Sequence, residues 1–348
     1  MKKFVFILLF LFLFFLLVGG SYARQAVSFP ELNRPFSITV NADKLFITDG
    51  PVVYIHSMKD FSLLNKFGKA GEGPGEFKVF ATINQGSVVL ALKGDKIMMT
   101  SLGRVSFYTL NGEFVEQKNI QSLFGFGIIR PFDTRYVGLG AAGDANKQYF
   151  TLNFYDPEFK KGDEMIRIIA FQGGKSINPI NIGILPAIST SNDRVFFLDY
   201  EGAIHIFDQV GKKLLEVSLS NILKNYSQEK ITEERKNKYI QYFLSDPRFK
   251  PQFERDRNNV KFPDTFPKIR DFRVEGNKIY AVTFRELHHQ KELVILDQEG
   301  HLIKKMMVSL GEINPRELVP YTIKDGTLYQ LVENPDTEEW ELHSRKLL

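Results

Sequence analysis

A short motif recurs six times along this chain: a turn residue is followed by Lys, Arg or Thr and then by the start of a strand. The copies are Asp43-Lys44-Leu45-Phe46, Asp95-Lys96-Ile97-Met98, Thr134-Arg135-Tyr136-Val137, Asp193-Arg194-Val195-Phe196, Asn277-Lys278-Ile279-Tyr280 and Gly326-Thr327-Leu328-Tyr329. Their first apolar residues stand at positions 45, 97, 136, 195, 279 and 328, in steps of 52, 39, 59, 84 and 49 residues. Four of the five steps lie near 50, and such a period indicates a repeat architecture.

Each repeat predicts four short strands. One strand precedes the motif, as in residues 36–40, and the motif opens the second. An alternating third strand, a turn rich in Gly or Asp, and a fourth strand follow, as in residues 52–56 and 63–67. Four antiparallel strands at a period of roughly 40 to 50 residues are typical of propeller blades. The fold class predicted is therefore an all-β, six-bladed β-propeller with four-stranded antiparallel blades.

The last repeat is one strand short. Residues 320–348 offer strands near 328–331 and 340–343. We expect residues 25–29, close to the start of the chain, to pair with this repeat and close the ring.

The single long step contains an insertion at residues 221–266, between blades 4 and 5. Ser227 is a possible N-cap for a helix that runs to Asp246-Pro247, with apolar residues three or four apart. The insertion is too aromatic for a disordered linker. We expect a helical, aromatic cap on the face where blade connections emerge, acting either as a plug or as a lid or partner-binding surface. The partner-binding residues predicted there are Tyr239, Tyr242, Phe243, Phe249 and Phe253.

A glycine-rich loop, Phe67-Gly68-Lys69-Ala70-Gly71-Glu72-Gly73-Pro74-Gly75-Glu76-Phe77, ends the first repeat. It does not open a helix, so turn geometry is the better interpretation than a phosphate-binding loop. The loop resembles the inter-blade signature of NHL-repeat-like six-bladed propellers, and the chain is similar to the bacterial exported six-bladed β-propeller family. The other blades lack the loop. The resemblance implies the fold more than any activity.

The N-terminus predicts export. Lys2 and Lys3 precede an apolar run from Phe4 to Val18, and small residues reach Ala23. This pattern is typical of a secretory signal peptide, here residues 1–23, and the run is shorter than the roughly 20 residues of a membrane-spanning helix. An uncleaved anchor is the alternative. We expect residues 24–348 to form the propeller, in the periplasm or outside the cell, without stable membrane insertion after cleavage.

The amino-acid composition limits the kinds of site and partner that we expect for this chain. The chain has no Cys, which excludes disulfides and Cys-ligated metals, and its formal net charge of +4 includes two lysines of the signal. No basic run is present, so nucleic acid is not an expected partner. No pair of the six histidines shows metal-ligand spacing on a helix, and we expect no metal and no cofactor. The pair in a loop between two strands, His288-His289, is the least easily explained as structural.

The first strands of the blades should surround the central channel, and they are poor in carboxylates. They hold Arg34, Arg130, Lys268 and Arg270, a set that predicts an anion-binding channel mouth. The alternative is that these cations form structural ion pairs with Asp133 or Asp271.

Three functions remain open at this point. The preferred hypothesis is a ligand- or protein-binding module whose recognition surface is the channel mouth and the 221–266 insertion, with a small anionic ligand or an envelope protein as partner. The alternative is a metal-dependent hydrolase or lyase of the lactonase or NHL-lyase type that uses the central channel. A scaffold in a cell-envelope assembly is the third. The fold alone does not choose among them.

Overall fold

The computed structural model describes residues 27–78, 88–120, 128–144, 146–172, 178–181, 186–191, 193–223 and 226–348. The predicted signal peptide lies outside them. No helix in these ranges has the length and apolar character needed to cross a membrane.

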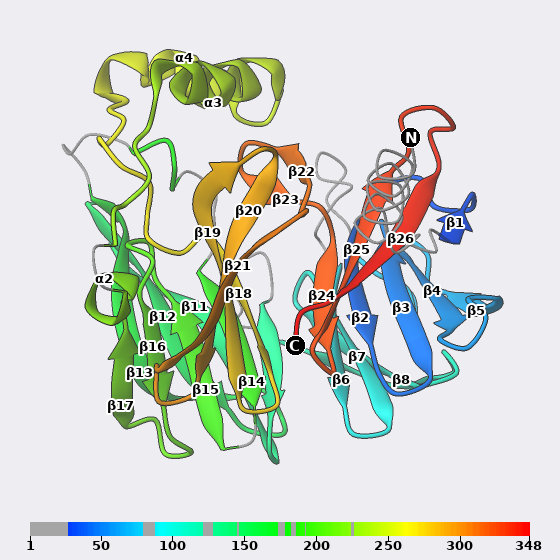
Figure 1. Cartoon of the computed structure of the whole chain (residues 1–348). Helices are drawn as coiled ribbons and strands as arrows, with labels where there is room; N and C mark the ends of the chain where they lie inside the picture. Colours follow the sequence, from blue (N-terminus) through cyan, green and yellow to red (C-terminus); the bar gives the residue numbers. More distant parts are fainter. Residues whose placement is uncertain are drawn as a thin grey trace, which may run out of the picture.

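Six four-stranded antiparallel sheets form the blades of a propeller (Figure 1). Their innermost strands, β2, β6, β10, β14, β18 and β24, contact one another in a closed cycle. Blade 1 consists of β2 (Pro35–Val40), β3 (Lys44–Asp49), β4 (Val52–Ser57) and β5 (Leu63–Phe67). Blade 2 consists of β6 (Val88–Lys93), β7 (Lys96–Ser101), β8 (Arg104–Thr109) and β9 (Phe114–Asn119). Blade 3 consists of β10 (Ile129–Phe132), β11 (Arg135–Gly143), β12 (Lys147–Tyr155) and β13 (Lys161–Gln172). Blade 4 consists of β14 (Ala187–Ser191), β15 (Arg194–Leu198), β16 (Ile204–Phe207) and β17 (Lys213–Val217). Blade 5 consists of β18 (Asp271–Glu275), β19 (Lys278–Leu287), β20 (Gln290–Asp297) and β21 (Leu302–Val308). Blade 6 consists of β24 (Tyr321–Lys324), β25 (Thr327–Glu333), β26 (Trp340–Lys346) and β1 (Val27–Phe29). The predicted fold class is confirmed.

The recurring motif opens the second strand of every blade, because the residues before it form the hairpin turn. In blade 6, Asp325 and Gly326 both have positive φ, at 49° and 65°, and they connect β24 directly to β25. Two-residue hairpins favour this geometry because it matches the right-handed twist of the strands. The turn chemistry therefore marks the blades in the sequence.

The predicted ring closure is also confirmed. Strand β1 pairs antiparallel with β26, from Val27 opposite Leu342 to Phe29 opposite Trp340. The indole N–H of Trp340 donates to the carbonyl of Asn33 at 3.1 Å. The N-terminal segment thus supplies the outermost strand of blade 6 and ties the two ends of the chain together.

Both faces of the blades are buried, which accounts for the apolar second and third strands. Six clusters of buried side chains each join two neighbouring blades around the ring. The glycine-rich loop contributes to one of them: it turns back through Gly68, with φ of 90°, and inserts the fully buried Phe77 between blades 1 and 2. The turn interpretation of this loop is confirmed.

Helices connect blade 4 to blade 5, as predicted, and α3 and α4 lie over one face of the ring (Figure 1). They are α2 (Leu219–Ile222), α3 (Glu233–Ser245), α4 (Lys250–Arg255) and the 3-10 helix η1 (Arg257–Asn259). The predicted start of the main helix at Ser227 is wrong. Residues before α3 are extended, because Ile231 donates to the carbonyl of Asp264, and Thr232 is the N-cap. The predicted end is correct, since Asp246 is the C-cap.

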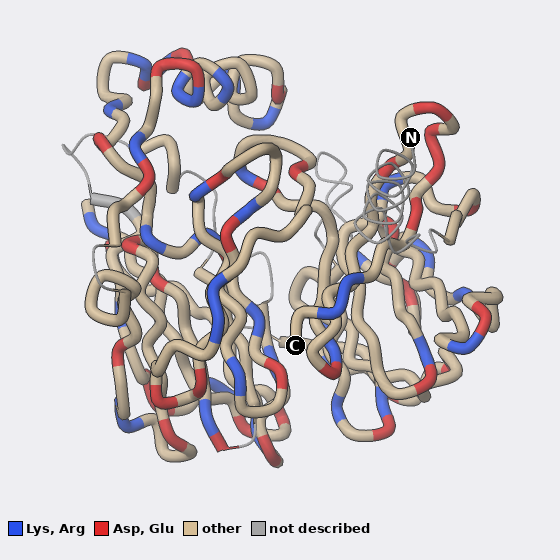
Figure 2. Tube along the Cα trace, in the orientation of Figure 1, with Lys and Arg blue, Asp and Glu red and all other residues tan. Residues whose placement is uncertain are grey.

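A two-stranded hairpin, β22 (Glu312–Asn314) and β23 (Glu317–Leu318), precedes the innermost strand of blade 6. Its turn passes below α3, where Tyr239 donates to the carbonyl of Pro315 at 2.9 Å. Lys and Arg residues are interspersed with Asp and Glu residues along the described trace (Figure 2).

Candidate anion site in the central channel

A cavity of about 660 Å³ lies on the axis of the ring. All six innermost strands contribute to its wall, and residues from the β22–β23 hairpin and the end of the cap complete it. Four arginines line the cavity: Arg130, Arg270, Arg273 and Arg316. Three carboxylates share the wall with them: Asp199, Asp271 and Glu317. Which charges are already paired decides what the cavity can bind.

The carboxylate of Asp199 is held within its own turn. It lies 2.8 Å from Nε2 of His205 and accepts the backbone N–H groups of Glu201 and Ala203 at 2.9 Å. Burial raises the pKa of Asp199, but these hydrogen bonds outweigh burial and leave the pKa below its ordinary value. Asp199 is therefore an ionised and satisfied part of the wall.

Asp271 and Arg273 neutralise each other on β18. Nη1 of Arg273 lies 2.9 Å from both carboxylate oxygens of Asp271, and Tyr321 donates its hydroxyl to the same carboxylate at 2.9 Å. The guanidinium of Arg273 also lies 4.2 Å from the centre of the Tyr321 ring. Burial disfavours the charge of Arg273, but Asp271 outweighs burial, so the pKa of Arg273 is raised.

Arg130, on β10, differs from these residues because it has no carboxylate partner among the described residues. Its Nη1 donates only to the carbonyl of the preceding Ile129, at 3.2 Å. Burial and then the nearby charge of Arg273 lower the pKa of Arg130 to about 10. The group is still charged at neutral pH, and its N–H donors are largely free to bind an anion.

Arg316, in the turn between β22 and β23, is the second cation of the wall without a carboxylate partner in the described part of the chain. Its guanidinium carbon lies 4.9 Å, 5.4 Å and 5.5 Å from the ring centres of Phe249, Phe243 and Tyr242 of the cap. Its Nε is buried without a hydrogen-bond partner. Burial lowers the pKa of Arg316.

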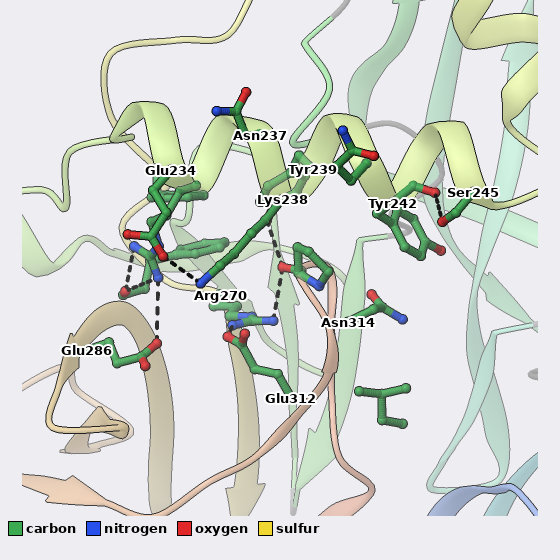
Figure 3. Close-up of a pocket in the computed structure, with 16 residues that line it drawn as sticks. Glu234, Asn237, Lys238, Tyr239, Tyr242, Ser245, Arg270, Glu286, Glu312 and Asn314 are labelled. Carbon is green, nitrogen blue, oxygen red and sulfur yellow. Dashed lines mark hydrogen bonds and ion pairs between the residues drawn. The ribbon is translucent and has the colours of Figure 1, made fainter.

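Arg270 lines the channel cavity and also a second cavity, of about 790 Å³, beneath α3. Figure 3 shows this second cavity. Its guanidinium pairs with Glu312 and donates to the carbonyl of Pro315 at 3.2 Å. The buried Lys291 lies 2.6 Å from the same Glu312 and also pairs with Glu286. Burial raises the pKa of Glu312, but Arg270 and Lys291 outweigh burial and bring the pKa below its ordinary value. This network joins blade 5 to the β22–β23 hairpin, and Arg235 of α3 lies 3.8 Å from its Glu286.

Two of the four cations predicted to surround the channel line the cavity, namely Arg130 and Arg270. Arg34 is exposed, does not line it, and binds Asp49 through its backbone N–H at 3.0 Å. Lys268 is also absent from the cavity wall, and its backbone packs on the turn that contains Gly202. For Arg270 the alternative of a structural ion pair applies, although the partner is Glu312 and not Asp133 or Asp271. Sequence reasoning missed Arg316 because the hairpin that carries it belongs to no repeat.

The predicted partner-binding residues of the cap are mostly interior. Tyr239, Phe243 and Phe253 are at most 5% exposed and form one cluster with Phe266, at the end of the insertion, and Phe284 of β19. Tyr242 and Phe249 are partly buried around the same cluster. Their role in binding a partner stays a prediction, and the accessible surface of the cap consists mainly of other residues.

The histidines are dispersed. His56 and His205 are buried in the third strands of blades 1 and 4, while His288 and His289 are exposed in the β19–β20 turn. No three His, Asp or Glu side chains gather into a metal-binding group in the described ranges.

No family model and no curated protein matches this chain. Among solved structures, it is similar to BamB from Moraxella catarrhalis, at 14% identity, with 88% of this chain and 71% of that chain covered and a TM-score of 0.33. A protein of unknown function from Bacteroides caccae is similar at 7% identity, with 79% and 81% covered and a TM-score of 0.41. The computationally designed protein Ika8 gives 8% identity, 93% and 100% covered, and a TM-score of 0.39. At these values the likeness does not extend beyond the propeller architecture, and the resemblance to NHL repeats stays a prediction.

Proposed function

We propose that this protein is an exported binding propeller whose central channel receives a small anionic ligand. The observation that carries the proposal is Arg130, a guanidinium in the wall of the cavity that no carboxylate of the described chain neutralises. A buried charge normally has a partner because leaving water is costly. A bound anion would supply that partner.

The neighbouring charges support this position for the ligand. Burial and then charge repulsion from Arg273 lower the pKa of Arg130, while Asp271 is already engaged by Arg273 and Tyr321. An anion beside Arg130 would reduce this repulsion and form charge-assisted hydrogen bonds, which are roughly twice as strong as neutral ones. The proposed export rests on the N-terminal pattern of Lys2, Lys3 and the apolar run that follows.

The test is anion binding to the purified protein without its signal segment, with inorganic phosphate, acetate and benzoate as probes in titration calorimetry and thermal unfolding. We expect at least one probe to raise the unfolding temperature, because a ligand that binds only the folded state stabilises it. Arg130→Gln should weaken that binding by about 10- to 100-fold, the range for losing a hydrogen bond to a charged group.

Arg255→Gln is the matched control, because the Arg255 side chain is 72% exposed in the cap and lines neither cavity. It should leave anion binding unchanged. Without ligand, Arg130→Gln should be no less stable than the natural chain, because it removes the repulsion with Arg273. Equal binding by the natural protein and Arg130→Gln would refute the channel site.

A further inference from the structure

We propose that the ligand of the channel is an organic molecule with two anionic groups, one bound by Arg130 and the other by Arg316 beneath the cap. This inference rests on the proposed function and specifies the class of ligand. It follows from the pairing of the four arginines in one wall: Arg270 and Arg273 are neutralised by Glu312 and Asp271, whereas Arg130 and Arg316 have no carboxylate partner in the described part of the chain.

Arg316 is suited to the second position because its charge is held in place without being neutralised. The three cap rings attract the cation, and the Tyr242 hydroxyl is within hydrogen-bonding reach of it, but none of the three carries a negative charge. The adjacent Glu317 does not form an ion pair with it; the Glu317 carboxylate accepts from Nδ2 of Asn314 at 3.1 Å. Arg316 lines the cavity, so an anionic group of a ligand there would neutralise its charge.

The size and lining of the cavity favour an organic molecule over a single inorganic ion. Its volume of about 660 Å³ lies within the roughly 300–1,000 Å³ of sites for small organic molecules. The remaining wall consists largely of apolar side chains and hydroxyl groups, among them Phe36, Ile38, Leu90, Ser189 and Phe272. Such a wall suits an uncharged body between two charged ends.

The arrangement also gives the cap a part in recognition. Tyr242, Phe243 and Phe249 contact Arg316 but do not line the channel cavity, so they act on the ligand through that arginine. The aromatic insertion and the basic channel, predicted from the sequence as separate features, then belong to one site.

The test compares dicarboxylates with monocarboxylates of the same length in titration calorimetry: succinate, glutarate, adipate and suberate against butyrate, valerate, caproate and caprylate. Pyrophosphate against phosphate is the phosphoryl arm. We expect at least one dianion to bind the natural protein tenfold or more tightly than its monoanion. Arg316→Gln should remove this advantage while leaving monoanion affinity within about twofold, and Arg316→Lys should retain part of it.

The outcomes separate the two proposals. If no probe binds, or if Arg130→Gln binds all of them like the natural protein, the proposed function fails. If Arg130→Gln loses monoanion binding but no dianion is preferred, or Arg316→Gln keeps the preference, only the two-anion inference fails. Thermal unfolding of each variant is the control that shows that the ring and cap are folded. Phe249→Leu keeps an apolar side chain but removes an aromatic ring from Arg316. It should reduce the preference for dianions without changing the affinity for monoanions.

Discussion

The ring and the cap are held by different interactions. Between blades, clusters of buried aliphatic and aromatic side chains interlock around the whole circle, as in the cluster of Phe196, Ile206 and Ile279 between blades 4 and 5. The cap has a smaller, aromatic core that also includes Phe284 of blade 5, and Tyr239 adds a hydrogen bond to the carbonyl of Pro315. The ring therefore provides the frame, and the cap adds a smaller aromatic cluster over one face of it, with three of its rings against Arg316.

The largest expected effects distinguish these two cores. Phe196→Ala and Phe243→Ala each remove a fully buried ring and should each cost about 3–5 kcal/mol of unfolding free energy. We expect Phe196→Ala to lower the stability of the whole ring, and Phe243→Ala to raise hydrogen exchange in residues 226–266 while exchange in the blades changes little. Equal loss of protection in blades and cap with Phe243→Ala would show that the two are one cooperative unit.

A smaller effect is expected at the ion pairs between blade 5 and the β22–β23 hairpin, beneath the cap. Glu312→Gln removes the carboxylate that Arg270 and Lys291 share. The free energy of unfolding should fall by about 3 kcal/mol, which is the lower end for breaking a buried ion pair, because Glu312 is partly exposed. Glu299→Gln is the control, because its pair with Arg194 is more exposed and should matter by less than about 1 kcal/mol. Chemical unfolding measures both, and similar losses for the two would contradict a special role for Glu312.

The carboxylate of Glu312 also makes the stability of the folded protein depend on pH. The pKa of Glu312 in the folded protein lies below its ordinary value of 4.5, so its stabilising contribution is complete above that pH and is lost as the pH falls through the lower folded value. In acid, the natural protein should lose stability more steeply than Glu312→Gln. Parallel pH profiles for the two would show that the carboxylate is not ionised in the folded state as described.

The smallest expected effect concerns the start of α3. Thr232 accepts the N–H of Arg235 at 3.3 Å, so Thr232→Ala should destabilise the cap by about 1 kcal/mol and Thr232→Ser by much less. Hydrogen exchange in α3 is the measurement. An unchanged α3 in Thr232→Ala, or an equal effect of Ser227→Ala, would contradict the helix start given by the structure.

Much of the ring was predictable because blade turns repeat a local chemistry. The six motifs fall at the second strands, and even the closing strand could be inferred from one incomplete repeat. The cap was predicted less completely: its place and its helical end were correct, but the helix start was not. Ser227 was an acceptable local cap, yet the pairing of Ile231 with Asp264, distant in the chain, keeps that segment extended.

The sequence by itself determined the period, the turns and the apolar strands, because these depend on neighbours a few residues apart. It also pointed to a basic channel, and Arg130 does line the cavity. Only the tertiary structure decided which cations remain without a partner: Arg270 meets Glu312 from a hairpin 42 residues away, while Arg130 and Arg316 meet no carboxylate of the described chain. Ion pairing in a ring depends on which side chains converge on the axis, and the linear order of residues does not specify that convergence.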